Sequence, residues 1–236
     1  MYSFPPIAAT IGALHTVVAG LVSLLDPFLG AASATAAIVA LVVTVRALLL
    51  PLGYAQVRAE RTRTRLTPEV REIQRKYRSN PERLRRELAA LYAREQTTPL
   101  AGCLPTLAQA PVFTVLYGLF LVEEIDGHAN SLLDQTAAGV PLGAHLADVA
   151  TSPGVLVFAA LLVLLALAAW ATRRITPRVD APGAGLVRWL PFGTLAIAAF
   201  VPLAAGIYLL ATTAWTVGER VTMRRIVAQR HGADGG

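Results

Sequence analysis

The sequence has a single cysteine, Cys103, and only four histidines among its 236 residues. One thiol cannot form a disulfide within the chain, and no cysteines or histidines are spaced like the ligands of a zinc or iron–sulfur centre. No glycine-rich loop of the kind that binds phosphate is present. We therefore expect no metal site and no cofactor, and we interpret a single histidine such as His15 as structural or interfacial.

Charged residues are also scarce, at 15% of the sequence, whereas 55% of the residues are hydrophobic. A chain this apolar is typical of a helical membrane protein with several spans rather than of a soluble domain. No basic residue precedes Arg46, so the first residues do not resemble a secretory signal or an organelle transit peptide. The expected fold class is all-α, that of a polytopic membrane protein.

The 21 basic residues are unevenly distributed along the chain. Twelve lie between Arg58 and Arg94, and none lies between Gln96 and Thr172. Residues 122–152 hold five acidic residues and no basic one. Because basic loops stay in the cytoplasm, this pattern assigns loops to the two sides of the membrane: 54–98, 173–186 and 223–236 inside, 1–32 and 122–152 outside.

Five apolar runs alternate between these loops, and we predict that each forms a transmembrane helix. The fourth run is short, because its fifteen residues cover about 22 Å of a hydrocarbon core about 30 Å thick. The resulting topology has the N-terminus outside and the C-terminus inside. The predicted spans are 33–53, 99–121, 153–172, 187–201 and 203–222.

A further apolar stretch, 7–25, is also long enough to cross a membrane. Crossing would place an N-terminus without basic residues in the cytoplasm, against the charge rule. We therefore predict a helix that lies on the outer surface of the membrane. A sixth span is the alternative.

The cytoplasmic segment 54–98 is predicted to form a basic helical hairpin. Thr67-Pro68-Glu69 is typical of a helix start, and Ser79-Asn80-Pro81-Glu82 of a turn followed by a second start. Apolar residues recur at helical spacing on both sides of that turn. They are Leu66, Val70, Ile73 and Tyr77 before it, and Leu84, Leu88 and Leu91 after it.

The basic residues of this hairpin have two interpretations. In the first, they form a solvated face and do no more than enforce the topology. In the second, they dock an anionic partner, either ribosomal RNA or lipid headgroups. The charge alone does not decide between them. The candidate docking residues are Arg71, Arg75, Lys76, Arg78, Arg83, Arg85 and Arg86.

Arg46 lies inside the first predicted span, 13 residues from its outer end and 7 from its inner end. A charge at such a depth costs about 2.5–3.5 kcal/mol on insertion scales. Its side chain could snorkel to the cytoplasmic interface. We favour a hydrated cavity that is open to the cytoplasm, because we expect no acidic residue in another span to pair with Arg46.

Polar side chains of other spans are candidates for lining the same cavity. Most single threonines in membrane helices bond only to their own backbone, whereas a carboxamide such as that of Gln109 is unfavourable against lipid. The candidate groove residues are Arg46, Thr106, Gln109, Tyr117, Tyr208, Thr212, Thr213 and Trp215.

Three segments resemble the YidC/OxaA family of membrane protein insertases. The family's cytoplasmic hairpin is similar to LTPEVREIQRKYRSNPERLRRELAALY (66–92). Its second core span is similar to PLAGCLPTLAQAPVFTVLYGLF (99–120), and its last span to FVPLAAGIYLLATTAWTVGER (200–220). The resemblance implies five spans around a hydrophilic groove, with the hairpin on the cytoplasmic side and an outer interfacial helix before the core.

The resemblance also implies a function without catalysis in the bacterial plasma (inner) membrane. Arg46 attracts the polar outer segment of a substrate into the groove, and the apolar helix of that substrate passes the third and fifth spans into lipid. Insertion occurs with the Sec translocon or independently of it. The implied partners are nascent membrane proteins, the ribosome, the Sec translocon and anionic lipids, with no specific small-molecule substrate.

A small transporter or channel is the alternative function. Such proteins often contain internal repeats and place coordinating polar groups at mid-membrane, and we find no repeat in the sequence. An intramembrane protease is less favoured, because apart from Ser33 the predicted spans contain no serine or aspartate.

Overall fold

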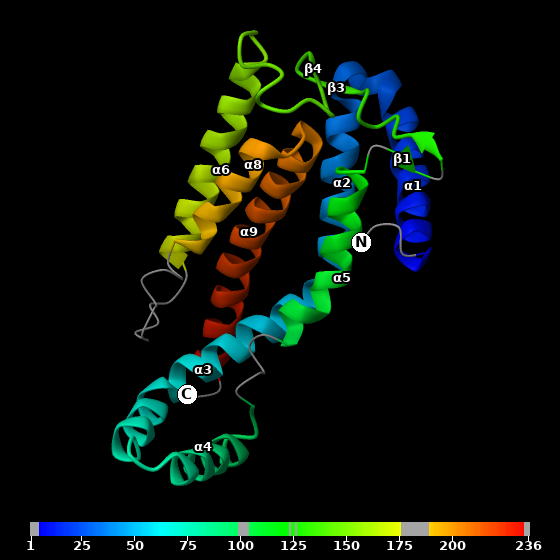
Figure 1. Cartoon of the computed structure of the whole chain (residues 1–236). Helices are drawn as coiled ribbons and strands as arrows, with labels where there is room; N and C mark the ends of the chain where they lie inside the picture. Colours follow the sequence, from blue (N-terminus) through cyan, green and yellow to red (C-terminus); the bar gives the residue numbers. More distant parts are fainter. Residues whose placement is uncertain (1–4, 99–103, 123, 126, 176–188, 234–236) are drawn as a thin grey trace. The chain divides into compact units, whose positions relative to one another are not determined.

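The computed structural model describes residues 5–98, 104–122, 124–125, 127–175 and 189–233. This part of the chain is mostly helical, which confirms the expected all-α class (Figure 1). The chain divides into two compact units, residues 1–48 with 111–221 and residues 49–110 with 222–236. We call them the core unit and the hairpin unit and describe each by itself.

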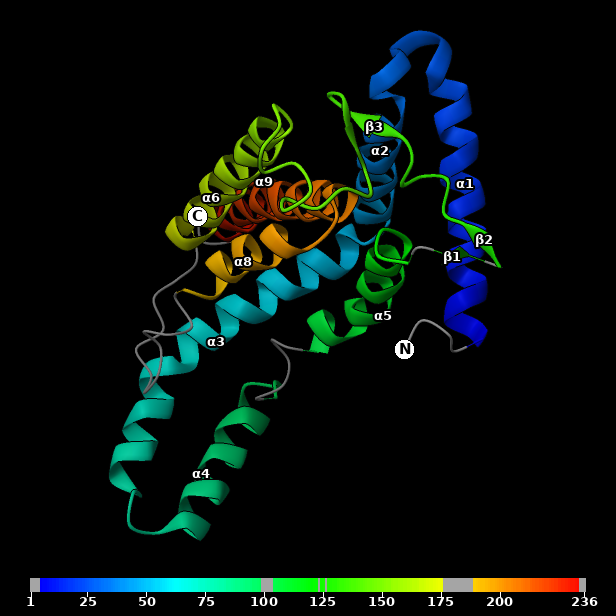
Figure 2. The ribbon, with the colours of Figure 1, turned by 45° about the horizontal axis from the view of Figure 1, so that its top comes forward.

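Two antiparallel helices begin the core unit, α1 (Pro5–Leu29) and α2 (Ser33–Leu48). They are joined by a short 3₁₀ helix, η1 (Gly30–Ala32), in which Gly30 has a positive φ of 49°. The two helices lie side by side along their length in both views (Figures 1 and 2). Both are apolar, and residues 5–48 include a stretch hydrophobic enough to cross a membrane.

The packing of α1 bears on the prediction of a surface helix. Ile11 and Val18 of α1 are 2% and 0% exposed and belong to the same buried cluster as Ala37 and Ile38 of α2. A helix on the membrane surface lies across the ends of the spans. In the structure α1 packs along α2 rather than across its end, and the choice between a surface helix and a sixth span stays a prediction.

α5 (Leu104–Leu119) coincides with the second predicted span, whose residues 99–103 lie outside the described part. The buried side chain of Asn130 closes its C-terminal end. The Asn130 amide nitrogen donates to the carbonyl oxygens of Leu119 at 2.9 Å and of Val122 at 3.0 Å. Carbonyls at the end of a helix have no partner within it, so this amide supplies one where water has no access.

The predicted outer segment 122–152 contains two short antiparallel pairs. β1 (Glu124–Ile125) pairs with β2 (His128–Ala129), and β3 (Thr136–Ala137) pairs with β4 (Val140–Pro141). Ala138 and Gly139, between β3 and β4, have positive φ values of 50° and 80°, as in a type I′ turn. The sequence analysis did not predict these strands, because two-residue strands leave no alternating pattern.

The third and fourth predicted spans pack against each other as α6 (Val155–Ile175) with η2 (Leu190–Phe192) and α8 (Gly193–Phe200). α6 is long and apolar enough to cross a membrane. α8 has only eight residues. Together α8 and η2 rise about 18 Å, and residues 187–188 of the predicted fourth span lie outside the described residues.

α9 (Leu203–Ala233) begins where two carbonyl groups of the outer segment meet it. The backbone N–H of Leu203 donates to the Ala144 carbonyl at 3.0 Å, and that of Ala204 donates to the Leu142 carbonyl at 2.8 Å. These bonds satisfy N–H groups that the first turn of a helix leaves without partners. The predicted boundary between the last span and the tail at residue 222 is not a break in the helix, because the basic tail remains helical as far as Ala233.

The hairpin unit contains α3 (Leu50–Lys76) and α4 (Pro81–Arg94), and the second of these begins as predicted. Asn80 caps α4, because its side-chain oxygen accepts from the Arg83 N–H at 3.0 Å. The predicted helix start at Thr67 was wrong, since α3 runs through Pro68. The Thr67 hydroxyl instead donates to the Arg63 carbonyl at 2.8 Å, as threonines inside helices commonly do.

Candidate functional site

Arg46 lies in the last turn of α2 and is half-buried in the core unit. Its positive charge acts on two groups of α9, the Tyr208 phenol and the Glu219 carboxylate. Within the described ranges, however, no carboxylate makes a direct ion pair with Arg46.

Glu219 corrects an expectation drawn from the sequence. We expected no acidic residue in another span, yet Glu219 lies within the predicted last span, 203–222, on α9. Its carboxylate is half-buried and accepts a hydrogen bond of 3.0 Å from the indole nitrogen of Trp215, one turn earlier. The sequence signal was the i, i+4 spacing of Trp215 and Glu219, which places both on one face of the helix.

An aromatic cluster surrounds the buried Tyr208, which is 2% exposed. The ring centroids of Phe113 and Phe120 both lie 5.9 Å from that of Tyr208, and the Tyr117 centroid lies 6.3 Å away. Phe113 and Tyr117 also stack at 5.4 Å. These contacts connect the predicted groove residues Tyr117 and Tyr208, and they add two phenylalanines that the search for polar residues missed.

The threonines of α9 differ in their hydrogen bonding. The Thr213 hydroxyl donates to the Leu209 carbonyl at 2.7 Å and so is satisfied within its own helix. The Thr212 hydroxyl is buried near the Tyr208 phenol and has no partner with hydrogen-bond geometry among the described residues. Thr212 therefore lies beside Tyr208, whereas Thr213 is bonded within its own helix.

Two predicted groove residues lie outside this description. The backbone of Thr106 and Gln109 belongs to α5, but their side chains are not among the described ones. Their assignment to a groove remains a prediction. The structure therefore brings Tyr117 and Tyr208 together, with Thr212, Trp215 and Glu219 on the same helix as Tyr208 and with Arg46 on α2.

The core unit also contains an apolar crevice of about 580 Å³. Its walls come from α2, the β3–β4 turn, α6 and α9, and they include Thr35, Leu161, Leu203 and Ile207. Apart from Thr35 the lining carries only apolar side chains. This crevice is distinct in chemistry from the hydrophilic groove that we predict around Arg46.

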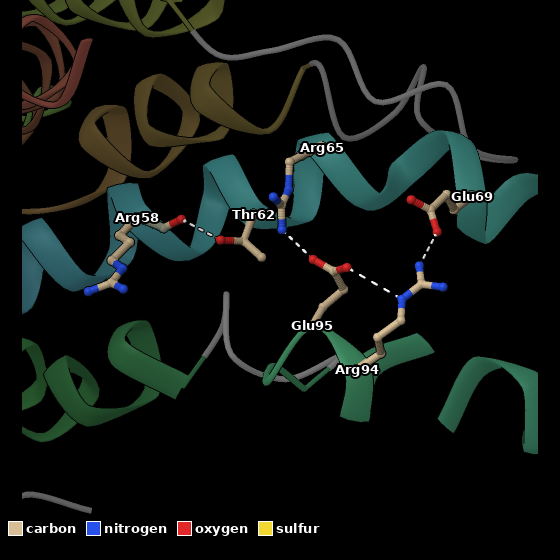
Figure 3. Close-up of polar contacts among 6 residues, drawn as sticks. All are labelled: Arg58, Thr62, Arg65, Glu69, Arg94 and Glu95. Atoms are coloured by element: carbon tan, nitrogen blue, oxygen red, sulfur yellow. Dashed lines mark hydrogen bonds and ion pairs between the residues drawn. The ribbon is translucent and has the colours of Figure 1, made fainter. Parts of the chain in front are cut away.

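The base of the α3–α4 hairpin is held by a chain of charges (Figure 3). Arg65 pairs with Glu95, and Arg94 bridges Glu95 at 3.6 Å and Glu69 at 2.7 Å. Exposed ion pairs contribute little stability, about 0–1 kcal/mol each. The buried leucines of α3 and α4 supply the hydrophobic contact, and the charge chain fixes the register of the two helices.

The basic residues predicted to dock a partner are all exposed on this hairpin. Near the turn, Lys76 and Arg83 lie over the Tyr77 ring, 5.4 and 5.0 Å from its centroid. Arg83 also lies 3.9 Å from Glu87, one turn along α4. The basic surface of the hairpin is therefore accessible to an anionic partner. The Tyr77 ring orders two of the cations on that surface, Lys76 and Arg83.

Comparison with known proteins identifies the class to which this fold belongs. Residues 24–230 match the family model described as 60Kd inner membrane protein. A membrane protein insertase YidC from Zymomonas mobilis is 30% identical over 177 residues, which are 72% of this chain and 30% of that protein. One from Streptomyces avermitilis is 30% identical over 215 residues, 80% of this chain and 50% of that protein.

The sequence identity is higher with a third relative, over a shorter stretch of this chain. A membrane protein insertase YidC from Clostridium perfringens is 35% identical over 115 residues, which cover 49% of this chain and 48% of that protein. The chain thus spans about half or less of the length of these relatives. The family match covers most of its residues, and the chain belongs to the 60Kd inner membrane protein family that includes the YidC insertases.

Proposed function

We propose that this protein inserts other proteins into the bacterial inner membrane and helps them fold, through a hydrated groove built around Arg46. The observation that carries the proposal is a half-buried arginine in an apolar helix with no direct ion pair among the described residues. A cation at that depth needs water or a polar guest to remain charged. The acidic or polar outer segment of a substrate is such a guest.

The driving force for insertion is the transfer of an apolar helix from water into lipid. Each buried methylene group contributes about 0.8 kcal/mol, so the transfer of a whole span far exceeds the cost of moving a short polar segment. Exposed apolar residues of α6, among them Leu156, Val163 and Leu167, offer a surface past which a substrate helix moves. No nucleotide is needed in this mechanism, with or without the Sec translocon.

The hairpin unit is proposed to recruit the ribosome through its exposed cations. Ribosomal RNA presents a dense array of phosphates, and each arginine or lysine that contacts one releases a counterion. The exposure of the basic residues on α3 and α4 supports this role. Binding to anionic lipid headgroups is the competing explanation for the same charge.

Topology is the remaining part of the proposal. Arg173 and Arg174 stack on Trp189 and Trp170, with guanidinium carbons 4.5 and 4.6 Å from the ring centroids. Arginine with tryptophan is typical of a membrane interface, and the basic residues support our proposal that the C-terminal end of α6 is on the cytoplasmic side. We also infer that α1 crosses the membrane beside α2, which makes six spans and brings the residues before α1 to the cytoplasm.

Rescue of insertase-depleted bacteria tests this function, with insertion of a single-span substrate that carries an acidic outer segment as the readout. We expect the wild-type chain to restore insertion, Arg46→Ala to lose most of it, and Arg46→Lys to retain part of it. Arg58→Ala, which removes an exposed arginine of α3, serves as the control. Normal insertion by Arg46→Ala would contradict the groove mechanism, and failure of the wild-type chain would contradict the function.

A further inference from the structure

Two arginines near the end of α6 each lie over a tryptophan ring. The guanidinium carbon of Arg173 is 4.5 Å from the ring centroid of Trp189, and that of Arg174 is 4.6 Å from the centroid of Trp170. Trp170 lies one turn before Arg174, whereas Trp189 immediately precedes η2, which packs against α6 (Figure 1). Both rings are about half exposed, at 51% and 55%. Because the two arginines are neighbours in sequence, these four residues flank one helix end, and we call them the arginine–tryptophan site.

The two guanidinium groups have donors to offer to an anion. Among the residues that the structure describes, neither Arg173 nor Arg174 pairs with a carboxylate. A contact with the face of a ring uses none of the N–H donors of a guanidinium. The ring also restricts the side chain, so less freedom is lost when an anion binds. The fork of donors on each arginine matches the oxygens of a phosphate group.

An exposed apolar stripe on α6 leads to this site. Leu156, Val163, Leu167 and Trp170 are each more than half exposed. Their spacing places them, together with Arg174, on one face of the helix. From the first to the last of these residues the helix rises about 27 Å, close to the thickness of about 30 Å of a hydrocarbon core. When the stripe lies among acyl chains, Arg174 therefore lies at the level of the lipid headgroups.

We propose that the arginine–tryptophan site binds the phosphate of an anionic lipid, whose acyl chain lies along the exposed stripe of α6. Exposed tryptophans are typical of the headgroup level of a membrane, which favours a lipid over RNA as the ligand. A zwitterionic headgroup is a poorer ligand, because the two arginines repel the cation that it carries. An acyl chain and a substrate helix can occupy the stripe in turn, since both are apolar. The inference does not depend on the insertase function proposed above.

Quenching of tryptophan fluorescence by brominated lipid tests this site. The chain has three tryptophans, and Trp215→Phe leaves only Trp170 and Trp189, both of which belong to the site. This protein is reconstituted into phosphatidylcholine vesicles in which a small fraction of lipid carries bromine on its acyl chains. The brominated lipid is either phosphatidylglycerol or phosphatidylcholine. The ratio of the two quenching efficiencies measures the preference for the anionic headgroup.

We expect brominated phosphatidylglycerol to quench the Trp215→Phe protein more strongly than brominated phosphatidylcholine does. Adding Arg174→Gln should lower the relative affinity for phosphatidylglycerol about fivefold, and adding Arg173→Gln as well should abolish the preference. The matched control adds Arg85→Gln and Arg86→Gln instead, which remove two adjacent exposed arginines from α4. This control should keep the preference.

Three outcomes would overturn the inference. The first is equal quenching of the Trp215→Phe protein by the two brominated lipids, and the second is a preference that survives the loss of both Arg173 and Arg174. The third is an equal loss of preference in the control, which indicates a general attraction of a basic protein for anionic lipid. Because the Arg174 side chain is exposed, its single replacement leaves the core packing intact and reports on binding alone. None of these outcomes bears on the insertase function, which the rescue experiment tests separately.

Discussion

The end of the Leu161 side chain, on α6, packs against Gly206 of α9. A Cβ atom built at residue 206 would be 2.6 Å from Cδ2 of Leu161. A larger residue at position 206 therefore requires the buried Leu161 side chain to move. In membranes, where helices gain little from the hydrophobic effect, such small-residue contacts are a main source of helix association.

The first prediction concerns this contact. Gly206→Val should destabilise the core unit by about 1–3 kcal/mol, the usual cost of overpacking, and so lower the midpoint of thermal unfolding in detergent. Gly218→Ala, on the same helix with nothing within 4 Å of its Cβ position, should leave the midpoint nearly unchanged. Equal midpoints for Gly206→Val and the wild type would show that the Leu161 side chain moves aside without cost.

The second prediction concerns the basic surface of the hairpin. Replacing Arg71, Arg75 and Lys76 with glutamine should weaken cosedimentation with ribosomes and make it less dependent on salt, because fewer counterions are released on binding. The core unit should be unaffected. Arg65 and Arg94 are left in place, since they hold the base of the hairpin.

The control for that experiment distinguishes between the two candidate anionic partners, ribosomal RNA and lipid headgroups. Binding of the same variant to vesicles with and without anionic lipid is measured in parallel. If ribosome binding stays at the wild-type level while binding to anionic vesicles falls, the surface recognises lipid headgroups rather than RNA.

The third prediction concerns α1. With the native thiol removed by Cys103→Ser, a cysteine introduced by Ser3→Cys should react with a membrane-impermeant reagent only after the cytoplasmic side is opened. The reason is that α1 lies antiparallel to α2 and, with 25 residues, is about 37 Å long, enough to cross the bilayer. Reaction in intact cells would instead restore the outer surface helix and five spans.

The elements that the sequence predicted best are those set by local patterns. Apolar runs gave the positions of α2, α5, α6 and the start of α9, and the Asn80-Pro81 pair gave the start of α4. The extent of α3 was not predictable in this way. A proline in its interior carries the same local signal as one at a helix start, and only tertiary packing distinguishes the two.

Other features needed information from distant parts of the chain. The capping of α5 by Asn130 and of α9 by carbonyls of the outer segment joins residues that no short pattern relates. Glu219 was overlooked because hydropathy assigns a charged residue near the end of a span to the interface.

The bonds between the outer segment and the first turn of α9 connect main-chain atoms only. Side chains at positions 142 and 144 can therefore change without loss of these bonds, since every amino acid supplies the same carbonyl group. Shortening the segment by one residue would instead shift both acceptors away from their donors. These two bonds should accordingly be more sensitive to a change in the length of the segment than to the side chain at residue 144, whereas Leu142 is also constrained by its complete burial.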